Sequence, residues 1–132
     1  MMPDGMIICQ SAHGPKETMD RLAAAVTSRG MTILACIDHA AAAATAGLEL
    51  RPTEVLIFGN PRAGIPLMQA VQTIGINLPL KALVWQDAEG KTWLAYNDPT
   101  WLARRHGAEA GADRILEAMA AGLEAIAKEA TT

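Results

Sequence analysis

The sequence lacks any segment in which basic residues are concentrated, although 11 of its 132 residues are lysine or arginine. It also holds 14 acidic residues, so its net charge is −3. Binding along the phosphate backbone of nucleic acid needs a basic surface, and we therefore predict no nucleic-acid partner. No apolar run approaches the roughly 20 residues of a membrane span, and the first ten residues lack the regions typical of a signal peptide. We expect a cytoplasmic protein with no membrane partner.

Cysteine is scarce, and the known catalytic motifs are absent. Cys9 and Cys36 form no CxxC pair and have no histidine at a zinc-ligand spacing, so we predict no metal site and no cofactor. Buried core thiols are the simplest interpretation, whereas a redox pair would require the strands that carry Cys9 and Cys36 to be neighbours. The sequence has no GxSxG, no HExxH and no paired-carboxylate spacing. Whether the protein is an enzyme stays open.

Half of the sequence is hydrophobic and 19% is charged, which is typical of a globular chain. We expect a single domain over residues 1–132, because no linker or repeat divides the sequence. Aromatic residues are few, with one Phe, one Tyr and three Trp. Trp85, Trp93 and Trp101 are explained first by core packing, although tryptophan is also enriched at interfaces.

Alternating strand and helix signals run along the chain. Proline at first helical positions, aspartate caps and glycine stops set the element boundaries, and Gly90 supplies the turn of a hairpin. A doubly wound parallel sheet is one reading of the first 75 residues. We prefer an α+β two-layer sandwich, with helices packed on one face of a mixed or antiparallel sheet of about five strands. Strands are expected at 6–11, 31–38, 55–60 and in the hairpin 78–98, and helices at 15–29, 39–46, 66–74, 99–106 and 109–128.

The segment LIFGNPRAG places an abrupt corner between a strand and a helix. Such a corner presents free backbone amides and the positive end of a helix, which together hold anions in many proteins. It lacks the Lys-Ser/Thr pair of a phosphate loop and is not GxGxxG, so a nucleotide fingerprint is not supported. Two alternatives remain: Gly59, Asn60 and Pro61 form a ligand-binding loop, or they form only a turn.

Three other polar residues follow strand ends. His39 comes directly after the second strand and is a candidate acid, base or ligand if the second and third strands end on the same side. Tyr96 and Asp98 lie between the hairpin and the next helix, and capping is a sufficient explanation for Asp98. Arg62 is among the isolated basic residues able to neutralise an anion, although such residues are usually solvated.

The stretches FGNPRAG, LPLK and YNDPTWLARRHG resemble the family of the domain of unknown function 302, over residues 17–106. The resemblance implies a compact α+β domain and a homodimer, and it implies no established activity. Some relatives carry cysteine where this chain has Gly59 and Leu80. Thiol or metal chemistry in those relatives is therefore not transferable.

Three hypotheses follow. The first is a small-molecule or anion-binding domain whose pocket combines His39, Tyr96 and Asp98 with the corner Gly59-Asn60-Pro61. The second is an enzyme that uses His39 as acid or base. The third is a dimerising structural module without a ligand. The first two require His39, Asn60 and Tyr96 to converge on one cavity.

Overall fold

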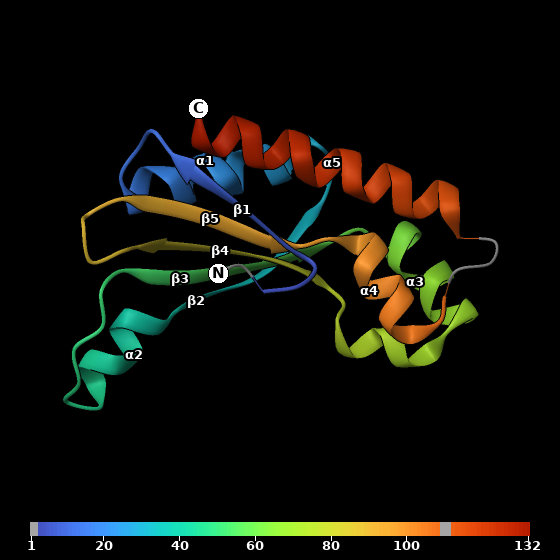
Figure 1. Ribbon diagram of the computed structural model, residues 1–132, viewed down its shortest axis with the longest axis horizontal. Helices are drawn as coiled ribbons and strands as arrows, with labels where there is room; N and C mark the ends of the chain where they lie inside the picture. Colours follow the sequence, from blue (N-terminus) through green and yellow to red (C-terminus); the bar gives the residue numbers. More distant parts are fainter. Residues whose placement is uncertain (1–2, 109–111) are drawn as a thin grey trace.

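The computed structural model describes residues 3–108 and 112–132. Five strands form one sheet in the order β1-β5-β4-β3-β2, and every neighbouring pair is antiparallel (Figure 1). The strands are β1 Met6–Ser11, β2 Thr32–Asp38, β3 Thr53–Gly59, β4 Leu80–Gln86 and β5 Thr92–Asn97. The helices are α1 Pro15–Ser28, α2 His39–Thr45, α3 Pro61–Ala70, the 3-10 helix η1 Gln72–Ile76, α4 Pro99–His106 and α5 Asp113–Thr131.

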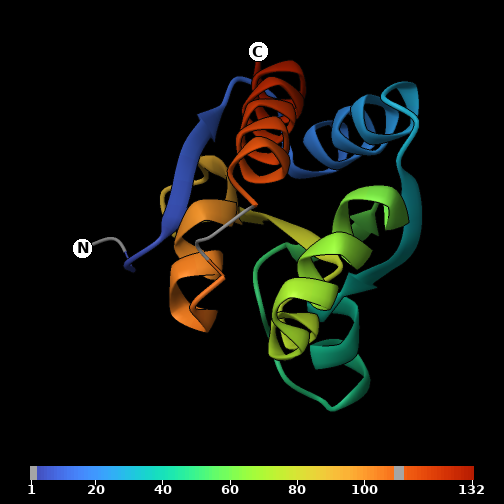
Figure 2. The same ribbon diagram turned by 90° about the vertical axis from the view of Figure 1, so that its right-hand side faces the viewer.

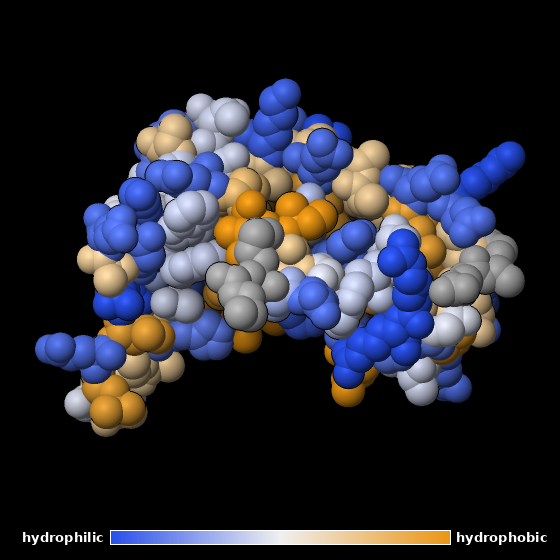
Figure 3. All heavy atoms as spheres, in the orientation of Figure 1, coloured by the Kyte–Doolittle hydropathy of each residue, from blue (hydrophilic) through white to orange (hydrophobic). Residues whose placement is uncertain are grey.

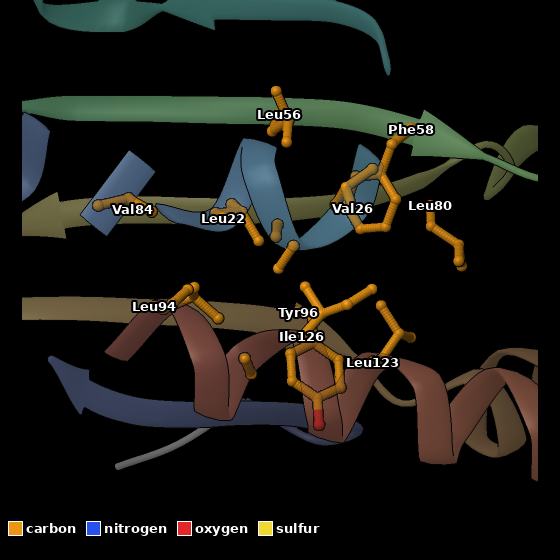
Figure 4. Close-up of a cluster of buried hydrophobic side chains, with 14 of the residues drawn as sticks. Leu22, Val26, Leu56, Phe58, Leu80, Val84, Leu94, Tyr96, Leu123 and Ile126 are labelled. Atoms are coloured by element: carbon orange, nitrogen blue, oxygen red, sulfur yellow. The ribbon is translucent and has the colours of Figure 1, made fainter. Parts of the chain in front are cut away.

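Helices α1 and α5 lie side by side across one face of the sheet (Figures 1 and 2). Their apolar faces meet the inward side chains of the strands in one buried cluster (Figure 4). α1 contributes Leu22 and Val26, and α5 contributes Leu123 and Ile126. The predicted α+β two-layer sandwich is confirmed. The strand members of the cluster include Leu56, Phe58, Leu80, Ala82, Val84, Leu94 and Tyr96.

A second, smaller cluster closes one end of the sheet. It joins α3, η1 and α4 to the first turns of α5, and its buried members include Leu67, Ile74 and Leu116. Figure 2 views the molecule from this end. The predicted beginning of the last helix near Glu109 lies outside the described residues, and α5 is described from Asp113.

Helix α3 begins five residues earlier than predicted. Its first residue is Pro61, and Asn60 caps it, whereas Pro66 lies inside the helix. Proline suits a first helical position because an N–H there would have no intrahelical acceptor, so its absence costs no hydrogen bond. Inside the helix, Pro66 removes one backbone hydrogen bond. The helix then ends at Ala70, and Gly75, the predicted end, falls within η1.

The opposite face of the sheet carries partly exposed apolar side chains. Trp85 lies directly opposite Trp93 on the neighbouring strand, and both are half-buried. Successive side chains of a strand point to opposite faces, so Val84 and Leu94 point into the helix layer and the two tryptophans point away from it. This outer face is bordered at one end by α2, which projects from the body of the molecule (Figure 1).

Helix α2 and the loop that follows it form an exposed lobe. Leu48 and Leu50 in this loop are 66% and 49% exposed. Hydrophobic side chains are visible on the lobe in Figure 3. The predicted Asp38 cap is confirmed, since the Ala41 amide donates a hydrogen bond of 2.9 Å to Asp38 Oδ1. A capped but sparsely packed helix relies on local interactions for its stability.

Candidate functional site

At the Asn60 corner, the backbone amides of the first turn of α3 donate their hydrogen bonds to Asn60 itself. The Arg62 amide donates to Asn60 Oδ1 at 3.0 Å, and the amides of Ala63 and Gly64 donate to the Asn60 carbonyl at 2.9 and 3.0 Å. Pro61 has no N–H to offer. All donors of the first turn of α3 are therefore occupied. The expected cradle of free amides is wrong, because the asparagine caps the helix that it precedes.

A cavity of about 740 Å³ nevertheless opens beside this corner. It lies between α3, α5, the chain leading from α1 into β2, and the start of β4, at the end of the molecule that faces the viewer in Figure 2. Most of its lining is apolar. The larger apolar side chains that line it are Met31, Leu34, Ile65, Met68, Leu78, Leu80, Ile115, Met119 and Leu123.

Small residues on two helices leave this space open. Ala118 and Gly122 stand four residues apart on α5 and therefore share one helix face. Gly64 of α3 also lines the cavity. A Cβ added at Gly122 would meet no atom within 4 Å. The gap between α3 and α5 thus follows from side chains too short to fill it.

The charged groups of the cavity are all positive among the described residues. Arg29, Arg62 and Arg114 line it, and no aspartate or glutamate does. Arg29 pairs with Glu129 at 3.0 Å. Arg62 and Arg114 form no ion pair with any residue that the structure describes. In a chain with a net charge of −3, this is a local concentration of positive charge.

His39 lies far from this cavity. Strands β2 and β3 are antiparallel, with Thr32 opposite Gly59 and Asp38 opposite Glu54. His39 therefore leaves β2 at the other end of the sheet, about 20 Å away along a strand of this length. The expectation that His39 and Asn60 share one rim is wrong, because it required β2 and β3 to end on the same side.

Tyr96 and Asp98 serve the fold: one is a core residue and the other caps a helix. Tyr96 is 6% exposed and packs between the sheet and α5 (Figure 4). Burial raises the pKa of Tyr96, and repulsion from Cys9, Glu124 and Asp98 in their ionised forms acts in the same direction. Asp98 caps α4 by accepting a hydrogen bond of 3.0 Å from the Thr100 amide. Neither lines the cavity, so the predicted convergence with Asn60 does not form.

Of the six residues predicted to bind a ligand, the structure places Gly59, Asn60 and Pro61 at the cavity. Sequence reasoning missed the wall supplied by α5, including Arg114 and Met119. The sequence signal for this wall is the Ala118 and Gly122 pair on one face of a strongly amphipathic helix. Two small residues on one helix face are equally compatible with close packing against a neighbouring helix. Only the position of α5 in the fold shows that they line a cavity instead.

The two cysteines lie on opposite edges of the sheet. Cys9 is on β1 and Cys36 is on β2, so they cannot pair within one chain. The redox-pair alternative is therefore wrong within one chain. Cys9 is half-buried, but Cys36 is exposed, which corrects the prediction that both are buried. Desolvation and then the nearby Glu54 carboxylate raise the pKa of Cys36 to about 11, so its thiol is protonated at neutral pH.

Among the residues that the structure describes, no helix has the length and apolarity needed to cross a membrane. In the same residues, no group of three or more histidine, cysteine, aspartate or glutamate side chains is arranged to hold a metal ion.

Comparison with known proteins gives relatives of two kinds. The chain is 45% identical over 130 residues to proteins named fluoride-specific ion channel FluC 1 from Brucella suis and Brucella abortus. These matches cover 98% of the chain but only 51% and 48% of the relatives, so the chain spans about half the length of the curated relatives it matches.

A solved structure has the same fold. It is described as an uncharacterized conserved protein DUF302 from Bacillus stearothermophilus, and it matches with a TM-score of 0.85 at 21% identity. The match covers 97% of this chain and 99% of that one. The family described as domain of unknown function DUF302 matches residues 7–126, which extends the resemblance predicted for residues 17–106. The chain therefore belongs to the DUF302 family.

Proposed function

We propose that the protein is a small-molecule-binding domain whose ligand occupies the cavity beside Asn60. The observation that carries this proposal is the cavity itself. Its volume of about 740 Å³ lies within the range of roughly 300–1,000 Å³ that is typical of ligand sites. Like those sites, it combines an apolar lining with a few charged groups, here Arg29, Arg62 and Arg114.

Binding is better supported than acid-base catalysis. The polar groups among the described lining residues are the three arginines, Thr32 and Asn60. Arginine stays protonated at any physiological pH and so serves as a positive anchor rather than a proton carrier. The enzyme alternative rests on His39, which lies at the other end of the sheet from this cavity.

Filling the cavity from α5 tests the proposal. Gly122→Leu is expected to raise the melting temperature of the free protein, because leucine favours a helix by about 1 kcal/mol over glycine and its side chain enters open space. The same variant is expected to lose any melting-temperature shift that a bound compound causes. A thermal-shift screen of metabolites against both proteins measures this.

Ala121→Leu is the matched control, because Ala121 is the exposed neighbour of Gly122 on α5. It is expected to keep the ligand response of the wild type. A compound that stabilises the wild type and Gly122→Leu equally binds elsewhere and contradicts the proposed site. A wild type that responds to no compound in the screen contradicts the function.

The outer face of the sheet supports a second role, which is assembly into a homodimer. Trp85 and Trp93 are paired there across two strands, and tryptophan is enriched among the residues that contribute most to interfaces. Leu83 lies on the same face between Val55 and Ala95. Leu83, Trp85 and Trp93 form an apolar surface that is only partly buried within one chain.

A charge on this face is expected to separate the two copies. Leu83→Glu should sediment as a monomer at concentrations where the wild type is a dimer, because a buried unpaired carboxylate is costly. Ala121→Glu is the control, since Ala121 is exposed on α5, on the other side of the molecule from this face. Trp93 is less suitable, because its Nε1 donates to Asp87 in the hairpin turn at 2.8 Å. A wild type that stays monomeric over a wide concentration range excludes this role.

A further inference from the structure

We propose that the ligand of the cavity is an amphiphile with an anionic head, such as a carboxylate, and a flexible unbranched apolar tail. This inference rests on the proposed function and specifies the class of ligand. Three features support it: the apolar lining, the arginines on both bordering helices, and the first-turn amides of α3, which already bond to Asn60.

The interior suits a flexible hydrocarbon chain. Three of the apolar lining residues are the methionines Met31, Met68 and Met119. Methionine is unbranched and adapts to irregular shapes, and surfaces rich in it accept varied apolar partners. The neighbouring Leu34 and Ile65 are 58% and 50% exposed. A tail lying between them would cover apolar surface that otherwise faces water.

The arginines select for an anion. Arg62 and Arg114 approach from α3 and α5, so they lie on both helices that border the cavity. Guanidinium groups bind carboxylates through paired hydrogen bonds. No acidic residue among the described lining competes for Arg62 or Arg114, whereas Arg29 is already paired with Glu129. A cationic head would meet only repulsion at these groups.

The position of Arg62 also favours an anionic head. It stands in the first turn of α3, which contains no acidic residue. A positive side chain at this end of a helix is opposed by the helix dipole. Local helix stability therefore does not explain the arginine. An anion beside it would interact favourably with both the guanidinium and the helix end.

A small anion without a tail fits less well. The first-turn amides of α3, which would hold a phosphate, already bond to Asn60. A bare anion would also leave most of the apolar lining in contact with water. A neutral apolar compound would bury the lining but leave the charges of Arg62 and Arg114 without a partner. Only the combined ligand matches both parts of the cavity.

Calorimetric titration with three probes of equal chain length tests the proposal. Decanoate, decan-1-ol and decyltrimethylammonium are compared below their micelle-forming concentrations. Decanoate is expected to bind about tenfold or more tightly than decan-1-ol, because of its charge-assisted hydrogen bonds. The ammonium compound is expected to bind more weakly than either. From hexanoate to decanoate, affinity should rise about fourfold for each added methylene.

Replacing the arginines separates the contribution of the anionic head to the affinity from that of the apolar tail. The double variant Arg62→Met and Arg114→Met keeps apolar stems but removes both charges. It is expected to lose about tenfold in affinity for decanoate and to bind decan-1-ol as the wild type does. Arg51→Met is the control, because Arg51 is exposed and lies outside this cavity.

The outcomes distinguish this inference from the proposed function. Equal affinity for decanoate and decan-1-ol overturns the anionic head and leaves a cavity that binds apolar ligands. Acetate or inorganic phosphate binding as tightly as decanoate overturns the tail. If none of the probes binds, the inference fails, and the Gly122→Leu screen then decides whether the cavity binds any other compound.

Discussion

Gly5→Ala is expected to lower the free energy of unfolding by about 2–5 kcal/mol. Gly5 precedes β1 with a φ of 74°, a backbone conformation that costs an L-residue about 1–2 kcal/mol. A Cβ at this position would also overlap the indole ring of Trp101 on α4. The ring or the chain must then move, and such overpacking costs about 1–3 kcal/mol. Denaturant unfolding measures the combined loss from the backbone and from overpacking.

Gly30→Ala separates the two contributions. Gly30 has a φ of 76°, but a Cβ there would meet no atom within 4 Å. Gly30→Ala should lower the free energy of unfolding by about 1–2 kcal/mol, from the backbone conformation alone. Equal losses in the two variants would show that the contact between Gly5 and Trp101 contributes nothing. The carbonyl of Gly5 also accepts a hydrogen bond of 2.7 Å from the Asp98 amide, so the strain would reach the start of α4.

Leu56→Ala is expected to cost about 2–5 kcal/mol, because the side chain is 2% exposed and lies in the cluster between sheet and helices. Ile57→Ala removes as many side-chain carbons from the next residue of β3. Ile57 points to the outer face and is half-buried, so its loss should be about 1 kcal/mol. Equilibrium unfolding at low protein concentration gives both values.

Similar losses for Leu56→Ala and Ile57→Ala would contradict a sheet packed on one face only. A loss for Ile57→Ala that grows with protein concentration would instead indicate that a second copy covers the outer face, since association stabilises the folded state by mass action. Measured at low and at high protein concentration, the pair of variants therefore reports on the core and on the proposed dimer.

Local signals predicted most of the elements. The caps Asp38 and Asp98 and the turn glycine Gly90 act through backbone groups within four residues of themselves, and all three lie where the sequence placed them. The beginning of α3 was missed because Pro61 and Pro66 both suit a first helical position. Asn60 before Pro61 was the stronger signal, since a cap and a proline at consecutive positions define one start.

Strand direction was less accessible from the sequence. Residues 39–52 connect β2 to β3 and are long enough for either a hairpin-like return or a parallel crossover. The apolar pattern of β3 is compatible with both. His39 was therefore assigned to the wrong end of the sheet, although the secondary structure around it was predicted correctly.

The candidate site was predictable only in part. The Gly59-Asn60-Pro61 corner belongs to one short stretch, and its turn chemistry is visible in the sequence. The opposite wall of the cavity comes from α5, whose residues Arg114 and Met119 lie far along the chain. Their approach to the corner is set by the packing of α5 on α1 and the sheet, and single-sequence patterns do not encode that distance.

Gly64, Ala118 and Gly122 give the cavity a further property. Its volume depends on side chains at the lower limit of size, so a larger side chain at any of these positions is expected to reduce it. Related chains with larger residues at these positions are expected to have a smaller or closed cavity on the same scaffold. If the cavity binds a ligand as proposed, ligand preference is expected to diverge faster than the fold, and residues 64, 118 and 122 are the positions at which to compare relatives.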